Sequence, residues 1–406
     1  MKREILRLCF AHALDAFARP ELSLLRRPVC SFHLCGGVGL ALAVALGMTL
    51  ATHLGLSPRV LGVLVTTSFA TFVALALVTK VVTGEERLIY YHHEIAILLT
   101  SALTLHLLDL PILPYLDVVI LGVGLFLACG RVGCLMVGCC HGRPHPWGVT
   151  YRAKHAEAGF PQHLVGVRLF PVQALEALFV FATVAAGSLL VWSGRPPGEA
   201  LAIYVFAYGG ARFVFEFVRG DADRPYLLGF SEAQWTSLAL MTASVVAAWR
   251  GDLPLPRLAA GATASVVLVM AGVAWKRRRD PGRRHELLHA RHVSELAIAL
   301  RDGVTNGPSA ARPVPLIETS RGLRISGQRL PGDGGPVDHY CLSSAGRPMR
   351  SAAAAAAAGL ILSLRPGDGP RELVRGAAGV FHLLVHAQEE RAEPPGVLTG
   401  AEAGVR

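Results

Sequence analysis

The chain is poor in charged residues, and this scarcity excludes an ordinary soluble protein. Only 17% of its 406 residues are Asp, Glu, Lys or Arg, whereas soluble domains carry about 25%. Hydrophobic residues make up 52%, and the mean hydropathy is +0.45. The formal net charge is +10, but the basic residues flank apolar segments and lack the interleaved aromatics of nucleic-acid-binding surfaces. We therefore expect a membrane protein whose basic residues meet anionic lipid headgroups, with no nucleic-acid partner.

The sequence also lacks a recognisable cysteine framework. Its eight cysteines show neither the spacing of a secreted disulfide scaffold nor the two Cys pairs of a zinc finger. Cys139 and Cys140 are adjacent and followed by His141, and neighbouring cysteines chelate one ion poorly. We expect reduced cysteines that act as small packing residues, and no metal.

The first 30 residues lack the apolar core and the small-residue cleavage site of a signal peptide. Basic residues instead alternate with Leu and Phe at loosely helical spacing over residues 1–31. This pattern predicts an amphipathic segment that lies on the membrane surface.

Long apolar runs dominate the rest of the first 275 residues, and about 20 such residues can cross a bilayer. Eight segments qualify, namely 32–54, 59–79, 88–110, 116–140, 171–193, 199–218, 230–249 and 257–275. The sequence predicts an all-α polytopic membrane protein with seven to eight transmembrane helices. The expected divisions are a basic N-terminal segment at 1–31, a transmembrane domain at 32–275 and a soluble α+β C-terminal region at 280–406.

The C-terminal region owes its predicted α+β character to short periodic segments. Residues 285–300 repeat apolar residues at helical spacing, and the alanine run 352–358 has high helix propensity. The stretches LIETSRGLRISGQ and HYCLSS read as strands. We expect a small unit of about 100 residues, in the size range of one domain.

The stretch GRVGCLMVGCCHGRPHPWG at 130–148 places Arg131 at the end of an apolar run. A charge at the edge of hydrocarbon costs about 2.5–3.5 kcal/mol on insertion scales, so it is rarely retained without a function. Glycines around it permit a close approach of another helix or of a ligand. Because a guanidinium donates two parallel hydrogen bonds to a phosphate, the stretch predicts a headgroup pocket at the membrane edge.

Polar residues recur every three or four positions in AIYVFAYGGARFVFEFVRG. A continuous helix would carry them on one face: Tyr204, Tyr208, Arg212, Glu216 and Arg219. Arg212 and Glu216 could simply neutralise each other. Arg219, however, is expected to lack a carboxylate partner, and a surplus guanidinium at the membrane edge suits a phosphate headgroup.

The segment LIYYHHEIAILL, at the start of 88–110, offers candidates for a general base. Imidazole takes up a proton near neutral pH, so His92 or His93 could serve, with Tyr91 as the alternative and Glu94 as an orienting partner. The same residues would also fit an interfacial belt of aromatic and histidine side chains.

Two further motifs flank the membrane edge. FPVQALEALF places Gln173 and Glu176 one turn inside segment 171–193, where they are possible partners for the arginines. GFSEAQW predicts a capping box between Ser231 and Gln234 at the start of a helix.

These motifs, in this order, resemble the prolipoprotein diacylglyceryl transferase family. The family's central signature, G-R-[IV]-G followed by G-C-C-[YH]-G-R-P, stands here as GRVGCLMVGCCHGRP. Its [HF]-P-x-Q-x-x-E appears as FPVQALE, and its Y-G-x-x-R-F-x-x-E-F-x-R appears as YGGARFVFEFVR. The resemblance covers roughly residues 85–250. It departs from the family at Cys134, where many members have Asn, and at Tyr91-His92-His93, which replaces Y/H-G-G.

The resemblance implies a transferase of lipoprotein biosynthesis that works without a cofactor. Such enzymes move the diacylglyceryl group of phosphatidylglycerol onto the lipobox cysteine in the signal peptide of a prolipoprotein. It also implies a multi-pass protein in the bilayer of the bacterial cytoplasmic (inner) membrane. By motif, Arg131 and Arg212 would hold the phosphate, and Glu216 would orient Arg212. The other expected substrate-binding residues are Gly142, Arg143, Gln173, Tyr208 and Arg219.

Two alternatives stay open. One is a related phospholipid-dependent transferase with a cytoplasmic or small-molecule acceptor, and the other is a non-enzymatic lipid-binding membrane protein. Far more Lys and Arg flank the apolar segments on the side of the site than on the opposite side, so the positive-inside rule turns the site toward the cytoplasm. The family's site faces outward, and we follow the family.

Overall fold

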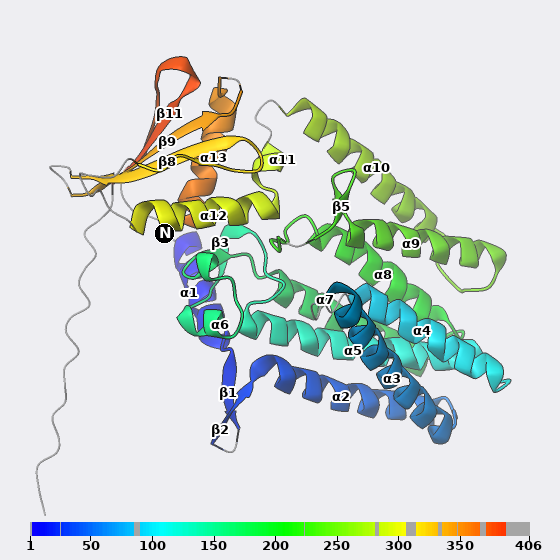
Figure 1. Ribbon diagram of the computed structural model, residues 1–406. Coiled ribbons are helices and arrows are strands. Elements are labelled where there is room, and N and C mark those ends of the chain that lie inside the picture. The colour runs from blue at the N-terminus through cyan, green and yellow to red at the C-terminus, as the bar shows by residue number, and fades with distance from the viewer. Residues whose placement is uncertain are drawn as a thin grey trace, which may run out of the picture. The chain divides into compact units, whose positions relative to one another are not determined.

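The computed structural model describes residues 2–24, 26–84, 90–222, 224–280, 284–305, 314–331, 335–346, 348–365 and 371–386. The chain divides into two compact units, Met1–Asp280 and Pro281–Arg406 (Figure 1). We call them the membrane unit and the C-terminal unit.

Each of the eight predicted apolar segments contains a helix of the membrane unit. These helices are α2 (Ser31–His53), α3 (Pro58–Thr83), α4 (Tyr90–Leu107), α5 (Ile112–Val137), α7 (Val172–Trp192), α8 (Glu199–Phe215), α9 (Glu232–Arg250) and α10 (Leu258–Arg279). Five of them, α2, α3, α5, α7 and α10, are long and apolar enough to cross a membrane. Helices α4, α8 and α9 are shorter, at 18, 17 and 19 residues. The helical, multi-pass character is thus confirmed, while the count of seven to eight crossings stays a prediction.

Helix α5 forms the centre of the membrane unit. Its apolar stretch is 61% buried, whereas those of α3 and α10 are 11% buried. Small residues let its neighbours approach closely. A Cβ atom at Gly124 of α5 would clash with the ring of Tyr204 on α8, and one at Gly187 of α7 would clash with Leu121 of α5.

A carboxylate of α5 caps the start of α8. Asp117 accepts hydrogen bonds from the backbone N–H groups of Gly198, at 2.6 Å, and Leu201, at 2.7 Å. These are among the first N–H groups of α8, which have no partner within the helix. These hydrogen bonds fix the start of α8, which carries Arg212, against α5, which carries Arg131. Asp117 lies 14 residues before Arg131, which is about 21 Å along the axis of α5.

A folded segment joins α5 to α7. It contains β3 (Pro144–Thr150), α6 (Ala153–Glu157), a short 3-10 turn (Gln162–Leu164) and β4 (Arg168–Leu169), and β3 pairs with β4. Helix α1 (Lys2–Phe17) packs against β3, where Asp15 accepts a 2.7 Å hydrogen bond from the Thr150 N–H. The hairpin of β1 (Glu21–Leu24) and β2 (Arg27–Cys30) leads into α2. The predicted N-terminal segment is thus largely helical, and its place on the membrane surface stays a prediction.

The capping box predicted at the start of α9 is confirmed. Ser231 Oγ accepts from the Gln234 N–H at 3.3 Å, and Gln234 Oε1 accepts from the Ser231 N–H at 3.0 Å. The two-residue strands β5 (Tyr226–Leu227) and β6 (Phe230–Ser231) form the tight hairpin just before it.

The C-terminal unit is a five-stranded antiparallel sheet with helices packed on one face. The sheet order is β10-β11-β9-β8-β7, from β7 (Ile317–Glu318), β8 (Leu323–Leu330), β9 (Val337–Ser344), β10 (Arg371–Arg375) and β11 (Phe381–His386). The helices are α11 (Arg284–Leu287), α12 (Ala290–Thr305) and α13 (Ser351–Leu364) (Figure 1). Every second residue of β9 and β11 is buried, as expected for strands covered on one side. The predicted sheet-containing C-terminal region is confirmed.

Candidate active site

Glu176 of α7 is the centre of a buried group of charges. Its side chain is 1% exposed, and Arg131 Nε of α5 lies 3.0 Å from its Oε2. Arg212 Nη1 of α8 lies 3.5 Å from the same oxygen, and Arg219 Nη1 lies 4.0 Å from it. Tyr208 Oη donates a 2.9 Å hydrogen bond to Glu176 Oε1. The Glu176 carboxylate on α7 therefore gathers side chains from two other helices, α5 and α8, and from the turn after α8.

A second carboxylate, Glu216, follows α8 directly. Arg212 Nη2 lies 2.9 Å from Glu216 Oε1, and Ser231 Oγ donates to Oε2 at 2.8 Å. The Arg224 guanidinium also contacts Oε2. Arg212 is held by Glu176 on one side and by Glu216 on the other, so the plane of its guanidinium is fixed before any ligand arrives.

The chain leaves the helix after Phe215, and this changes the environment of Arg219. Arg219 Nη2 lies 2.7 Å from Asp221 Oδ2, which also lies 3.0 Å from Arg224 Nε. The expectation that Arg219 lacks a carboxylate partner is wrong. The expected single helical face also fails beyond Phe215, because a turn replaces the helix there.

Backbone contacts bring the signature stretch to this turn. Gly142 forms an isolated antiparallel bridge with Arg219, and its N–H donates to the Phe170 carbonyl at 3.1 Å. Arg143 Nε donates to the Arg219 carbonyl at 3.1 Å. A Cβ atom at position 142 would clash with the Phe170 carbonyl. The glycine is therefore needed for three segments to meet.

The group carries more positive than negative charge among the described residues. Its side chains, which we call the arginine cluster, are Arg131, Arg143, Arg212, Arg219, Arg224, Glu176, Glu216 and Asp221. Five guanidinium groups thus face three carboxylates, a surplus of two positive charges. Burial lowers the pKa of Arg143, and the charge of Arg277 lowers it further. Since charges interact strongly where water is scarce, the cluster favours an anion such as a phosphate.

The three candidate bases at the start of α4 point to different surroundings. Tyr91 is 4% exposed, and its Oη lies 2.8 Å from Ser237 Oγ of α9. Its ring centroid lies 5.7 Å from that of Tyr208, which in turn contacts Glu176. Tyr91 is therefore the candidate on the side of the arginine cluster.

The two histidines lie elsewhere. His92 Nε2 is 2.8 Å from Glu232 Oε1, and both side chains are more than one third exposed. His93 is buried, and its ring centroid lies 4.6 Å from that of Phe72 on α3. Neither histidine has a contact with the arginines in the described structure.

Gln173 and three cysteines lie around the end of α5 and the loop that follows it. Gln173 Nε2 donates to the Cys139 carbonyl at 2.8 Å, so it supports the loop after α5 and contacts no arginine in the described structure. The sulfur atoms of Cys134, Cys139 and Cys140 lie within 4.8 Å of one another. Sequence spacing does not reveal this proximity, because the chain turns at Gly138 (φ 89°).

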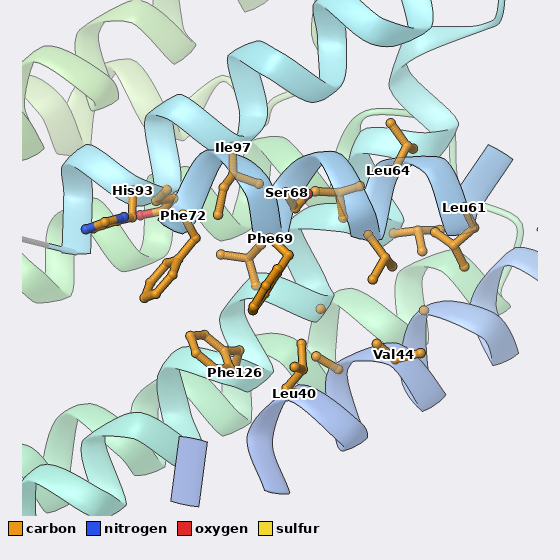
Figure 2. Close-up of a pocket in the computed structure, with 18 residues that line it drawn as sticks. Leu40, Val44, Leu61, Leu64, Ser68, Phe69, Phe72, His93, Ile97 and Phe126 are labelled. Carbon is orange, nitrogen blue, oxygen red and sulfur yellow. The ribbon is translucent and has the colours of Figure 1, made fainter. Parts of the chain in front are cut away.

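An apolar cavity lies between α2, α3, α4 and α5. Its cavity volume is about 170 Å³. Figure 2 shows Leu61 and Leu64 toward one end and His93 beside Phe72 toward the other. Phe126 of α5 also lines the cavity, five residues before Arg131, which is about 7.5 Å along a helix axis.

Sequence reasoning missed three residues that hold the cluster together. Asp221 and Arg224 lie in the turn after α8, and Ser237 lies one and a half turns into α9. The pattern RGDADR could have indicated a charge-paired turn, because Arg and Asp alternate within it. Nothing in the local sequence marks Ser237, whose contact with Tyr91 spans 146 positions.

The part of the chain that contains the arginine cluster is similar to known proteins. The family model of prolipoprotein diacylglyceryl transferase matches residues 88–250. A phosphatidylglycerol–prolipoprotein diacylglyceryl transferase of Dehalococcoides mccartyi (strain CBDB1) is 33% identical over 130 residues, which cover 32% of this chain and 48% of that protein.

Two clostridial proteins give similar matches. The phosphatidylglycerol–prolipoprotein diacylglyceryl transferase of Clostridium tetani (strain Massachusetts / E88) is 33% identical over 132 residues, covering 31% of this chain and 49% of its own. The protein numbered 2 under that name in Clostridium perfringens (strain 13 / Type A) is 30% identical over 141 residues, covering 33% and 51%. The chain spans about half the length of the curated relatives it matches.

Proposed function

We propose that the protein transfers a diacylglyceryl group from phosphatidylglycerol to the lipobox cysteine of a prolipoprotein, because residues 88–250 match the model of the prolipoprotein diacylglyceryl transferase family. The observation that carries the proposal is the surplus of two guanidinium charges among the described residues of the arginine cluster. A membrane protein that keeps such a surplus needs an anionic ligand, and a lipid phosphate is the anion at hand.

In the proposed reaction the thiolate sulfur of the lipobox cysteine attacks the glycerol carbon that bears the phosphate. A C–S bond forms, the C–O bond to the phosphate breaks, and glycerol phosphate leaves with the bonding electrons. Arg131 and Arg212 stabilise the negative charge that develops on the departing phosphate. Glu176 and Glu216 hold Arg212 in place, with Glu176 also facing Arg131.

Tyr91 is the residue we propose to meet the reacting thiol. It lies on the cluster side of α4, fixed by Ser237 and packed on Tyr208. His92 pairs with Glu232 at an exposed position, and His93 lines the apolar cavity. A neutral phenol both donates and accepts, so we propose that the Tyr91 hydroxyl relays the proton of the lipobox thiol to the departing glycerol phosphate and ends unchanged.

The remaining expected substrate contacts have defined places around this centre. Gly142 and Arg143 lie against the turn that carries Arg219, and Tyr208 contacts Glu176. Gln173 supports the loop that carries the cysteines. We propose that the first three approach the headgroup and that Gln173 positions their loop.

The apolar cavity is suited to hold an acyl chain of a lipid. Its lining is almost entirely hydrophobic, and it ends less than two helical turns along α5 from Arg131. We propose that one acyl chain of phosphatidylglycerol lies in this cavity while its phosphate meets the arginines.

We propose that the protein crosses the bacterial cytoplasmic membrane seven or eight times with the site facing outward. The excess of basic residues on the side of the site opposes that orientation. Reporter fusions in the loop 141–170 and after the last residue decide it. A loop inside the cell would favour the related transferase with a cytoplasmic acceptor, because no translocated lipobox could reach it.

Arg212→Lys tests the proposed chemistry. Lysine keeps the charge but loses the bidentate fork, so a transition-state clamp should lose roughly 100- to 1000-fold in turnover while lipid binding survives. The assay uses protein in phosphatidylglycerol vesicles, a lipobox peptide and mass detection of the thioether. Arg250→Lys, at an exposed pair with Asp252, is the matched control and should behave as wild type. Full turnover by Arg212→Lys would favour a protein that only holds headgroups.

A further inference from the structure

The sheet of the C-terminal unit has one covered face and one face that the described helices leave open. The covered face packs Ile325, Tyr340, Leu342, Phe381 and Leu383, each 4% exposed or less. Residues between them in the strands point to the opposite face and are partly exposed. The partly exposed positions of that second face include two histidines and a cysteine.

His339, Cys341 and His382 stand together on this open face. His339 and Cys341 are two residues apart on β9, so they share a face, and His382 on β11 lies directly opposite Cys341 in the antiparallel register. We call the three the imidazole–thiol cluster. They belong to no motif used for the proposed transfer reaction and lie in the other unit.

The potential ligand atoms of the cluster are close to one another. His339 Nε2 lies 3.0 Å from His382 Nδ1, and Cys341 Sγ lies 3.3 Å from His382 Nδ1 and 3.6 Å from His339 Nε2. The two imidazole rings are stacked at 25°, with centroids 5.2 Å apart. Three donor atoms thus form a small triangle at one point of the sheet.

The size of this triangle matches the coordination of one zinc ion. With Zn–N distances of about 2.0–2.1 Å and a Zn–S distance of about 2.3 Å, tetrahedral geometry separates two nitrogens by about 3.3 Å and nitrogen from sulfur by about 3.5 Å. Each separation in the cluster lies within about 0.4 Å of these values. Imidazole nitrogen and thiolate sulfur are also the ligands that zinc prefers.

Neighbouring residues support the orientation of both rings. Gln328 of β8 pairs with His339 and places its side-chain amide nitrogen, Nε2, 3.3 Å from His339 Nδ1; the amide's nitrogen and oxygen can exchange places by a 180° rotation. With the amide oxygen turned toward the ring, it accepts the Nδ1–H and leaves Nε2 free to bind a metal, as outer partners of metal-bound histidines do. Gly376 leaves room for His382, since a Cβ there would lie 2.8 Å from its Nε2.

We propose that His339 Nε2, Cys341 Sγ and His382 Nδ1 bind one zinc ion, with the fourth position open to water or an exogenous ligand. The Cys341 thiol releases its proton to solvent as the Zn–S bond forms, and both imidazoles bind in their neutral form. Three protein ligands and one open position distinguish this site from the closed four-ligand sites that only stabilise a fold.

The test titrates full-length, metal-stripped protein in detergent with cobalt(II) and then with zinc. The visible absorption spectrum of cobalt(II) depends on its coordination geometry. We expect one ion bound per chain, the spectrum of a tetrahedral site and a thiolate-to-cobalt charge-transfer band that disappears when zinc replaces cobalt. Cys341→Ser should remove the band, and His382→Gln should weaken binding at least about 100-fold. Gln328→Ala should weaken it about 10-fold, because only ring orientation is lost.

Two controls separate this site from others. His386→Gln changes a histidine on the same strand and face, and Cys139→Ser changes the sulfur group beside Arg131. Both should bind cobalt as wild type. The proposal is overturned if stripped wild-type protein binds no cobalt or zinc at micromolar concentration. It is also overturned if the charge-transfer band survives Cys341→Ser or disappears in Cys139→Ser.

Discussion

The arginine cluster of the membrane unit and the imidazole–thiol cluster of the C-terminal unit differ in the charge of the ligand that each one suits. Guanidinium groups stay charged at every physiological pH, so the arginine cluster keeps its surplus and suits an anion. Imidazole and thiol can both lose a proton, so the second cluster can become a neutral or anionic ligand set that suits a cation. The charge of the ligand that each cluster suits therefore follows from whether its side chains can give up a proton.

Removing the central carboxylate should break the first cluster most severely. In Glu176→Gln three guanidinium groups lose their shared counter-charge, and breaking a buried ion pair costs about 3–5 kcal/mol. We expect a large fall in the unfolding temperature in detergent and no transferase activity. Asp252→Asn, which removes the exposed partner of Arg250, is the control and should melt near wild type. A wild-type melting curve for Glu176→Gln would show that the cluster is not held by Glu176.

Tyr91→Phe should lower turnover strongly without unfolding the protein. If Tyr91 assists proton transfer, its loss costs roughly 100- to 10,000-fold, whereas the lost hydrogen bond to Ser237 costs only about 1 kcal/mol of stability. Initial rates with a lipobox peptide measure the effect. Ser237→Ala removes the same hydrogen bond but keeps the phenol, and His92→Gln alters an exposed neighbour. Equal losses in all three variants would argue for a purely structural role of Tyr91.

Filling the apolar cavity should have a smaller effect that depends on the lipid. Ser68→Phe places a ring among the residues that line the cavity. We expect activity to fall a few-fold with long-chain phosphatidylglycerol and to recover with short acyl chains. Val78→Phe, on an exposed part of the same helix, is the matched control. Equal loss with every chain length would place the lipid tail outside the cavity.

The smallest expected effect is a pH dependence in the C-terminal unit. His292 is fully buried, with Nδ1 2.8 Å from the Leu287 carbonyl and Nε2 3.0 Å from Thr319 Oγ1, and burial lowers its pKa. The unfolded chain therefore takes up a proton more readily, so this contribution to stability is present above about pH 6.5 and is lost as the pH falls through the folded pKa. Urea unfolding of the full chain at pH 7.5 and 5.5, followed by mass spectrometry of labelled C-terminal peptides, measures it. His292→Gln should reduce the difference between the two pH values, and an undiminished difference would assign it to other groups.

The membrane unit was largely predictable from sequence because a bilayer penalises polar residues. Arg131, Glu176 and Arg212 stand out in apolar segments, and their residue types indicate a phosphate site before any geometry is known. The helical period correctly places Arg212 beside Glu216. It fails for Arg219, since the helix stops at Phe215 and only the alternating Arg and Asp of RGDADR indicate the turn that follows.

The imidazole–thiol cluster could not be predicted in the same way. Alternation along β9 puts His339 and Cys341 on one face, but His382 is 41 residues beyond Cys341. Only the register of β9 against β11 brings them together, and register depends on packing of the opposite face. Residues two apart on a helix point in different directions, but only the packed structure shows that Tyr91 meets Tyr208 and Ser237 while His93 lines the apolar cavity.

The most direct test of the proposed function follows labelled phosphatidylglycerol into a lipobox peptide. Wild-type protein in vesicles of that lipid should yield a peptide whose cysteine carries a diacylglyceryl thioether, with one glycerol phosphate released for each peptide modified. Wild-type protein that binds the lipid but forms no thioether and releases no glycerol phosphate would contradict the account.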